Sequence, residues 1–237
     1  MKLGIYETNH IYNEDCIVGM RNMPAECIDE VVTDPPYLVG YKTHHRPDDE
    51  HRFCREILND NNPELIRQYF VECYRIAKPN TALYSFCDID TMAYFRECIE
   101  AAGYVVKNTI VWSKGGGGMG DLERTFAPDY EILLFAIKGD IKLHGKRCGS
   151  VWDFPKVPSG QLIHQNQKPV GLIMRAIEYH SKEGDVIFDG FIGGGTTAVA
   201  ARKLRRQYIG FELDGGYYKV AVERVEKEFA QMSFFWD

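Results

Sequence analysis

The sequence predicts a three-layer α/β sandwich whose central sheet is mostly parallel. Apolar runs with strand character alternate along the chain with stretches in which apolar residues recur at helical spacing. This alternation is typical of a parallel sheet that is covered by helices on both faces. An acidic residue at the end of one strand and a glycine loop at the end of another predict that the sheet binds a ligand at one edge.

The predicted elements follow from local composition. Branched and aromatic residues between turn signals predict strands at residues 28–33, 81–86, 104–112, 131–137, 186–189 and 208–211. Apolar spacing predicts helices near residues 63–77, 89–102, 169–180, 196–204 and 216–229. Pro63 and Pro169 suit the first turn of their helices, because a backbone N–H at that position has no intrahelical partner.

Length and composition predict a single domain that spans residues 1–237. The chain has 45% apolar and 26% charged residues, as ordinary globular proteins do. No apolar run reaches the ~18 residues of a membrane span, and the first residues lack the apolar stretch of a secretory signal. We therefore expect a cytoplasmic protein that has no association with membranes.

Cysteine usage and charge limit the classes of ligand. The seven cysteines are scattered, with no CxxC pair and no cluster at zinc-ligand spacing, so we expect reduced thiols and no metal. The net charge of −6 argues mildly against nucleic acid as a partner. Positive charge is nevertheless concentrated in residues 138–147 and 202–206, and a one-sided basic face would be enough for phosphate contact.

Three segments interrupt the alternation of strands and helices. Residues 38–62 are polar and include three histidines, residues 115–118 are four glycines, and residues 139–165 are rich in glycine, proline and basic residues. Loops of this length in a compact domain are usually functional or disordered. We expect a mobile loop at residues 38–62, and we expect all three segments to emerge near the sheet edge that carries Asp34.

The stretch that begins at Asp189 has the features of a cofactor loop. It follows an apolar strand, contains Gly193 and Gly195, and continues into a helix that begins at Thr196. Glycines let the backbone approach a ligand closely, and the helix N-terminus offers free N–H groups. Glu212 ends the next strand about 20 residues on, where an acid accepts hydrogen bonds from ribose hydroxyls. The alternative is an ordinary glycine turn followed by an unrelated glutamate.

The segment Asp34-Pro35-Pro36-Tyr37 follows an apolar strand and has the parts needed to hold a planar, amine-bearing base. The Asp34 carboxylate can accept a hydrogen bond from an exocyclic amine. Pro35 and Pro36 fix the turn and leave carbonyl oxygens free to accept the other amine proton. Tyr37 can stack on the base. An amine held by two acceptors becomes a better nucleophile. A plain proline turn on a loop is the alternative.

Because the catalytic segment precedes the glycine loop, the chain resembles the beta class of S-adenosylmethionine-dependent DNA amino-methyltransferases, over nearly its whole length. Residues 34–37 match the family's DPPY motif, and its glycine loop matches Asp189, Phe191, Gly193 and Gly195. The resemblance implies a Rossmann-like methyltransferase sandwich with one antiparallel strand and permuted motif order. It also implies S-adenosylmethionine as cofactor and a flipped base in double-stranded DNA as substrate.

The resemblance assigns further residues to the cofactor. Residues 13–16 resemble the family's opening segment, in which an aspartate reaches the adenine of the cofactor, so Asp15 takes this role beside Cys16. Lys168 precedes a predicted helix and is placed near the methionine end. Thr196 opens the helix after the loop, and Glu212 corresponds to the acid that binds the ribose.

The chain also departs from the family pattern. The family usually has proline at the position of Gly190 and serine at that of Gly194, so we expect a more flexible loop, which bears on cofactor affinity rather than cofactor identity. Residues 139–165 are a short candidate target-recognition segment. Recognition of DNA would then also need residues 38–62, a second subunit or a partner protein.

Adenine N6 is the predicted target, because cytosine-N4 members of the family often carry serine where Asp34 stands. Cytosine N4, an RNA base, and a catalytically silent module that binds DNA or a partner enzyme stay open as alternatives. The apolar residues 234–236 are expected either to dock on the chain's own surface or to lie in a homodimer interface. Enzymes that the chain resembles are often dimers.

Overall fold

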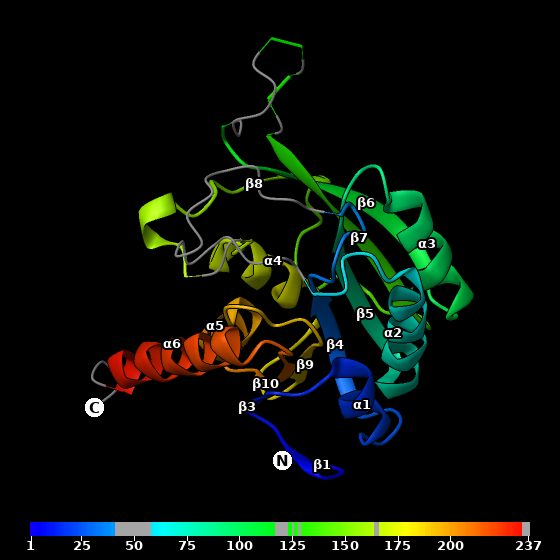
Figure 1. Ribbon diagram of the computed structural model, residues 1–237. Coiled ribbons are helices and arrows are strands. Elements are labelled where there is room, and N and C mark those ends of the chain that lie inside the picture. The colour runs from blue at the N-terminus through cyan, green and yellow to red at the C-terminus, as the bar shows by residue number, and fades with distance from the viewer. Residues whose placement is uncertain (41–57, 117–122, 125, 128, 164–165, 234–237) are drawn as a thin grey trace.

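A computed structural model describes residues 1–40, 58–116, 123–124, 126–127, 129–163 and 166–233, and it has the predicted three-layer sandwich (Figure 1). Within these residues, a central sheet of eight strands lies between two groups of helices. A separate antiparallel pair near the N-terminus is formed by β1 (Lys2–Leu3) and β2 (Tyr6–Glu7). The predicted fold class is therefore confirmed.

The order of strands places the two predicted ligand-binding strands next to each other at the centre of the sheet. The spatial order is β3 (His10–Tyr12), β10 (Gln207–Phe211), β9 (Val186–Asp189), β4 (Ile28–Thr33), β5 (Ala77–Cys87), β7 (Tyr130–Lys138), β6 (Val105–Ser113) and β8 (Val151–Asp153). β7 is antiparallel to both of its neighbours, and the other pairings of the described strands in this sheet are parallel. This arrangement confirms the expected single antiparallel strand.

Each face of the sheet packs against its own helices (Figure 1). One face carries α1 (Cys16–Arg21), α2 (Pro63–Ile76) and α3 (Met92–Ala101), and the other carries α4 (Val170–His180), α5 (Thr196–Lys203) and α6 (Gly215–Ser233). Successive strand residues point to opposite faces, so that Val31 packs in the first core and Val32 in the second. Strands buried on both faces are rich in apolar residues, and Val31-Val32 of β4 and Val186-Ile187-Phe188 of β9 are the runs that predict these strands from sequence.

Prediction and structure differ mainly at short elements. β3, α1 and β8 have no predicted counterpart, because three to six residues carry too little apolar periodicity. α1 begins after Asp15, whose side chain accepts hydrogen bonds from the N–H groups of Ile17 and Val18. Pro63 is the first residue of α2, as expected, whereas Pro169 is the N-cap of α4 and precedes its first turn.

Several predictions concern residues outside the described ranges. One is the expected mobile loop within residues 38–62, whose three histidines are His44, His45 and His51. Another is the expected docking of the apolar residues 234–236, on the chain's own surface or in a homodimer interface. Leu38 and Asp60, near the two ends of residues 38–62, are in contact, since the N–H of Leu38 donates to the Asp60 carboxylate at 2.8 Å. Of the helices in the described ranges, none has the length and apolarity that crossing a membrane requires.

Candidate active site

The candidate site lies at the carboxyl edge of the sheet, where β4 and β9 run side by side. The chain continues from β4 to β5 on one side and from β9 to β10 on the other, so a crevice opens between the two strands. Asp34 follows β4, Asp189 ends β9 and Glu212 follows β10. All three line one cavity of about 540 Å³. Small-molecule sites commonly have this volume.

The antiparallel strand adds two further charged groups to this edge. Because β7 runs against its neighbours, its first residues lie at the carboxyl edge, and Glu131 is the second residue of β7. β6 is parallel to the main direction and ends at the same edge, where Lys114 follows its last residue. Glu131 and Lys114 therefore line the cavity that Asp34 lines, although they are far from it in sequence.

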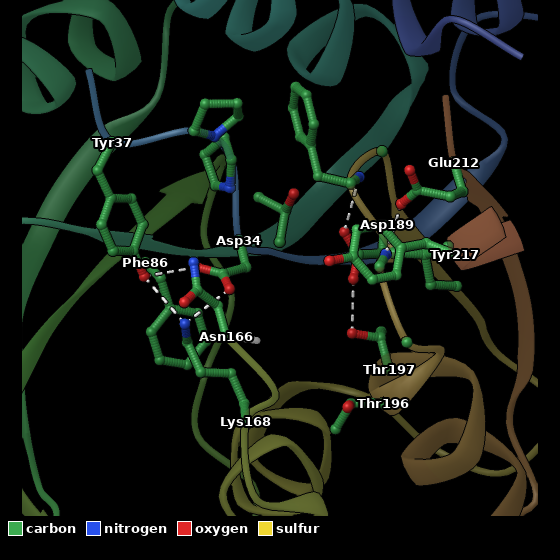
Figure 2. Close-up of a pocket in the computed structure, with 18 of the residues that line it drawn as sticks. Asp34, Tyr37, Phe86, Asn166, Lys168, Asp189, Thr196, Thr197, Glu212 and Tyr217 are labelled. Atoms are coloured by element: carbon green, nitrogen blue, oxygen red, sulfur yellow. Dashed lines mark hydrogen bonds and ion pairs between the residues drawn. The ribbon is translucent and has the colours of Figure 1, made fainter. Parts of the chain in front are cut away.

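Asp34, Lys168, Glu131 and Lys114 form a cluster in which negative and positive charges alternate, and we call it the charged cluster. Figure 2 shows Asp34 and Lys168 of this cluster beside Tyr37. Lys168 Nζ lies 2.6 Å from an Asp34 oxygen and 3.1 Å from a Glu131 oxygen. Lys114 Nζ lies 2.9 Å from the other Glu131 oxygen. The Tyr37 hydroxyl donates to the second Asp34 oxygen at 2.6 Å and accepts from Lys168 at 3.0 Å. Both oxygens of Asp34 thus have a fixed partner.

The electrostatics of the charged cluster centre on Lys168, whose side chain is only 6% exposed. Burial raises the pKa of Asp34, Lys168 opposes this effect, and the Glu131 charge adds to it. Burial also favours a higher pKa for Glu131, but the charges of Lys168 and Lys114 outweigh it and lower that pKa. Burial alone would lower the pKa of Lys168, yet the two carboxylates raise it. Lys168 is therefore a cation that favours the ionised form of Asp34.

The other end of the cavity is formed by the glycine loop and Glu212. One Glu212 oxygen accepts the N–H of Gly193 at 2.9 Å, and the other accepts the N–H of Asp214 at 2.8 Å. A carboxylate has about four acceptor positions, so a carboxylate fixed in this way can still bind ligand hydroxyls. Asp189 accepts hydrogen bonds from the loop and from the Thr197 hydroxyl, at 2.7 Å in the second case. Burial raises the pKa of Asp189 to about 7.

The structure brings the predicted site residues together around this cavity, with one exception. The lining includes Asp15, Cys16, Asp34, Pro35, Pro36, Tyr37, Lys168, Asp189, Phe191, Gly193, Thr196 and Glu212. Gly195 is not in the lining and is the N-cap of α5, with a φ of 78° that favours glycine. A Cβ at this position would lie 3.3 Å from the Cβ of Ala221, so Gly195 also permits close packing of α6.

Two predicted site residues make contacts that the sequence did not indicate. Lys168, which we expected near the methionine end of the cofactor, has its Nζ against Asp34 and Glu131. Asp15 lines the cavity but also uses one carboxylate oxygen to cap α1. Sequence reasoning did not include Glu131, Lys114 or Phe86 among the site residues. Glu131 and Lys114 stand at strand ends, but only the opposite directions of β7 and β6 show that both reach this edge.

Comparison with known proteins identifies the family. The profile of the N6_N4_Mtase family, described as DNA methylase, matches residues 28–223. The chain belongs to this family of DNA methylases. It is accordingly a DNA amino-methyltransferase that uses S-adenosylmethionine as methyl donor.

Relatives in this family cover most of the chain. It is 28% identical to type II methyltransferase M.HpaI of Haemophilus parainfluenzae, over 91% of this chain and 73% of that protein. It is 26% identical to the DNA adenine methyltransferase YhdJ of Escherichia coli K12, over 93% and 83% of the two chains. The identity to type II methyltransferase M2.DpnII of Streptococcus pneumoniae is 27%, over 95% of both chains.

Solved structures share the fold of this DNA methylase. The M1.HpyAVI complex with S-adenosylmethionine superposes with a TM-score of 0.72 at 23% identity, over 91% of this chain and 98% of that chain. The cytosine-N4-specific PvuII DNA methyltransferase superposes with a TM-score of 0.73 at 13% identity, over 95% and 92%. At these identities the likeness concerns the fold alone.

Proposed function

We propose that this DNA methylase transfers a methyl group to N6 of an adenine that is flipped out of duplex DNA. The observation that carries the proposal is the position of Asp34, whose carboxylate lines the same cavity as Gly193 and Glu212. A base that enters at Asp34 would therefore meet a methyl donor held at the glycine loop within one enclosed space. Such alignment of two reactants is a main source of rate acceleration.

Asp34 would hold the amine of the base. Tyr37 and Lys168 each use one position on its carboxylate, which leaves acceptor capacity for an amine N–H. The carbonyl of Pro35 would accept the second N–H, and the ring of Tyr37 would hold the base plane. The Lys168 charge lowers the pKa of Asp34 against the effect of burial, and so favours the carboxylate, the form that accepts a hydrogen bond without donating one. The raised pKa of Asp34 also suits this group to take the proton that the amine loses.

The residues at the other end of the cavity fit S-adenosylmethionine. Glu212 presents a carboxylate fixed by two backbone N–H groups, as hydrogen bonding to ribose hydroxyls requires. Gly193 and Gly194 line the cavity without side chains, so the backbone can approach the cofactor. Asp15, Cys16, Phe191 and Thr196 would complete the site. When bound, S-adenosylmethionine supplies an electrophilic methyl group on a positively charged sulfur.

The segment at residues 139–165 is our candidate for contact with DNA. Part of it is tied to the catalytic edge, since the N–H groups of Phe154 and Lys156 donate to the carbonyls of Ser113 and Lys114. Lys156 and Lys114 both line the cavity and carry positive charge. The basic residues 202–206 precede β10 and therefore lie at the opposite edge of the sheet. Residues 139–147 follow the end of the antiparallel β7 and begin at this opposite edge too, which corrects the expectation that the whole segment emerges near Asp34. Phosphate contacts near the flipped base would thus come from the part of the segment around Lys156.

Adenine is favoured over cytosine by the aspartate at position 34 and by the similarity to YhdJ, which is named as an adenine methyltransferase. The likeness to the cytosine-N4-specific PvuII enzyme extends only to the fold, at 13% identity. The test is to incubate the protein with S-adenosylmethionine and in vitro amplified duplex DNA, digest the DNA to nucleosides, and identify methylated bases by mass spectrometry. The same sequence as single strands tests the preference for duplex.

Asp34→Asn is the informative variant, because it keeps the size of the side chain and removes the charge. We expect N6-methyladenine with the wild type and a loss of about 100-fold or more with Asp34→Asn. Asp88→Asn is the matched control, since Asp88 also lines the cavity but is not part of the charged cluster. If the product were N4-methylcytosine, the target base would be cytosine and not adenine. If only RNA were methylated, DNA would be refuted as the substrate.

A further inference from the structure

The glycine loop contacts two side chains that come from opposite faces of the sheet. Its glycines at 190 and 194 stand where the family that the chain resembles usually has proline and serine. Tyr69 of α2 reaches the first glycine from one face, and Arg224 of α6 reaches the second from the other. Neither residue belongs to the motifs that identify the site. Both contacts involve loop backbone, so they bear on the shape of the loop.

Tyr69 and Gly190 fit each other closely. The Tyr69 hydroxyl accepts the N–H of Gly190 at 3.2 Å, and Tyr69 is fully buried. A Cβ on residue 190 would lie 2.4 Å from a ring carbon of Tyr69, so any larger residue would displace the ring. A proline at 190 would also remove the N–H that this hydrogen bond needs. The Tyr69 ring further contacts that of Phe191, with centroids 4.7 Å apart. The Tyr69 ring thus occupies the space that a side chain at residue 190 would need.

The Tyr69 hydroxyl also connects the glycine loop to β4, the strand that Asp34 follows. Tyr69 Oη and Thr33 Oγ1 lie 2.8 Å apart in a buried hydrogen bond. Thr33 is the last residue of β4 and directly precedes Asp34. A single phenol group therefore joins the backbone of the cofactor loop to the strand end that carries the catalytic carboxylate. A shift of the loop would therefore displace the end of β4 through the hydrogen bonds of the Tyr69 hydroxyl.

Arg224 holds the loop from the other face. Its Nη1 donates to the carbonyl of Gly194 at 2.8 Å and to the Thr196 hydroxyl at 3.1 Å. Burial lowers the pKa of this guanidinium, so the charge has lost part of its hydration. Arg224 is partly buried, and hydrogen bonds from a charged donor to a carbonyl are stronger than those between neutral groups. The carbonyl that Arg224 fixes belongs to a residue that lines the cavity.

We propose that Tyr69 and Arg224 are positioning residues that hold the backbone of residues 190–194 in its cofactor-binding shape. They supply from neighbouring helices the rigidity that the two glycines do not supply within the loop. The inference rests on our placement of S-adenosylmethionine at this loop but not on which base is methylated. Because Tyr69 also contacts Thr33, its loss affects the alignment of cofactor and base sites, whereas the loss of Arg224 affects only the loop and Thr196 at the start of α5.

The test measures cofactor binding rather than methylation. Tyr69→Phe keeps the ring and removes the hydroxyl, and Arg224→Met keeps the length of the side chain and removes the charge. We expect each variant of the full chain to bind S-adenosylmethionine about tenfold more weakly by isothermal titration calorimetry. Arg224→Lys restores a donor and should recover most of the affinity. Hydrogen exchange of the amides in residues 190–196 should be faster in both loss variants without any cofactor.

Matched controls separate positioning from general stability. Ile76→Val in α2 and Val225→Ala in α6 remove buried apolar groups from the same two helices. They should lower the melting temperature and leave the Kd for S-adenosylmethionine within about twofold of the wild type. Tyr69→Phe should also lower kcat, whereas Arg224→Met should act mainly through the KM for the cofactor. The proposal is overturned if the loss variants bind the cofactor like the wild type, or if the controls weaken binding equally.

Discussion

Replacing Lys168 by methionine tests how the charged cluster controls the carboxylate of Asp34, the proposed catalytic group. In the wild type, Lys168 Nζ lies 2.6 Å from Asp34 and 3.1 Å from Glu131 and separates these two acids. Methionine has similar length and no charge. The variant would therefore leave two carboxylates facing each other in a desolvated site, without the cation that stabilises both ionised forms.

The expected direction follows from the causes of each pKa. Burial and the Glu131 charge raise the pKa of Asp34, and Lys168 is the group that lowers it most. Without Lys168, Asp34 holds its proton to higher pH, and the protonated acid cannot accept from the amine with the same oxygen. An opposite charge within about 4–6 Å changes a carboxyl pKa by about 1–3. On the acidic side of the profile, the variant should therefore be about 10- to 1,000-fold slower at a fixed pH.

The assay is the methylation rate at saturating cofactor and DNA between pH 5.5 and 9.5, with stability checked at each pH. The acidic limb of kcat should move to higher pH in Lys168→Met, and the rate should recover in part at high pH. Lys114→Met is the graded comparison, because Lys114 contacts Glu131 at 2.9 Å but not Asp34, and it should move the limb less. An unchanged limb, with a rate loss that is equal at all pH values, would refute this role for Lys168.

Two further predictions concern the cofactor side of the cavity. Glu212→Gln removes the charge that faces Gly193 and the proposed ribose position, so the affinity for S-adenosylmethionine should fall about tenfold by calorimetry; an unchanged affinity would contradict the assignment. Burial raises the pKa of Asp189 from 3.8 to about 7, so its contribution to stability is full below pH ~4 and is lost as pH rises through 7. Asp189→Asn should remove this pH dependence, which amounts to about 4 kcal/mol in the free energy of unfolding between pH 4 and 8, measured by urea titration. If the free energy of unfolding of the variant fell as steeply over this pH range as that of the wild type, the prediction would be wrong.

The sequence predicts those parts of the fold and site that depend on local pattern. The strands predicted at residues 28–33 and 186–189 are β4 and β9, because each contains branched or aromatic apolar residues between turn signals. Asp34 and Asp189 follow from these two strands and Glu212 from the strand predicted at 208–211, since the carboxyl ends of parallel strands share an edge. Glu131 does not follow in this way. It stands at the amino end of its strand, and only the antiparallel pairing of β7 with β5 and β6 brings it to the site.

The glycine loop shows a second limit of position-by-position comparison. Gly190 and Gly194, considered alone, predict a looser loop than one with proline and serine. In the structure their contacts come from Tyr69 and Arg224, which lie 121 and 30 residues away along the chain. No local sequence pattern connects these positions. A missing side chain in a motif therefore has to be interpreted together with whatever fills the space.

The charged cluster gives a physical reason for the combination of residues at the base end of the cavity. A lone buried carboxylate at Asp34 would hold a proton and lose its function as an acceptor, while a lone cation beside it would repel the positive charge that develops on a methylated amine. The order Asp34, Lys168, Glu131, Lys114 avoids both problems, because each charge contacts an opposite one at 2.6, 3.1 or 2.9 Å and the four sum to zero. Glu131 is essential to this balance: it holds part of the Lys168 charge, so Asp34 remains able to accept from the amine.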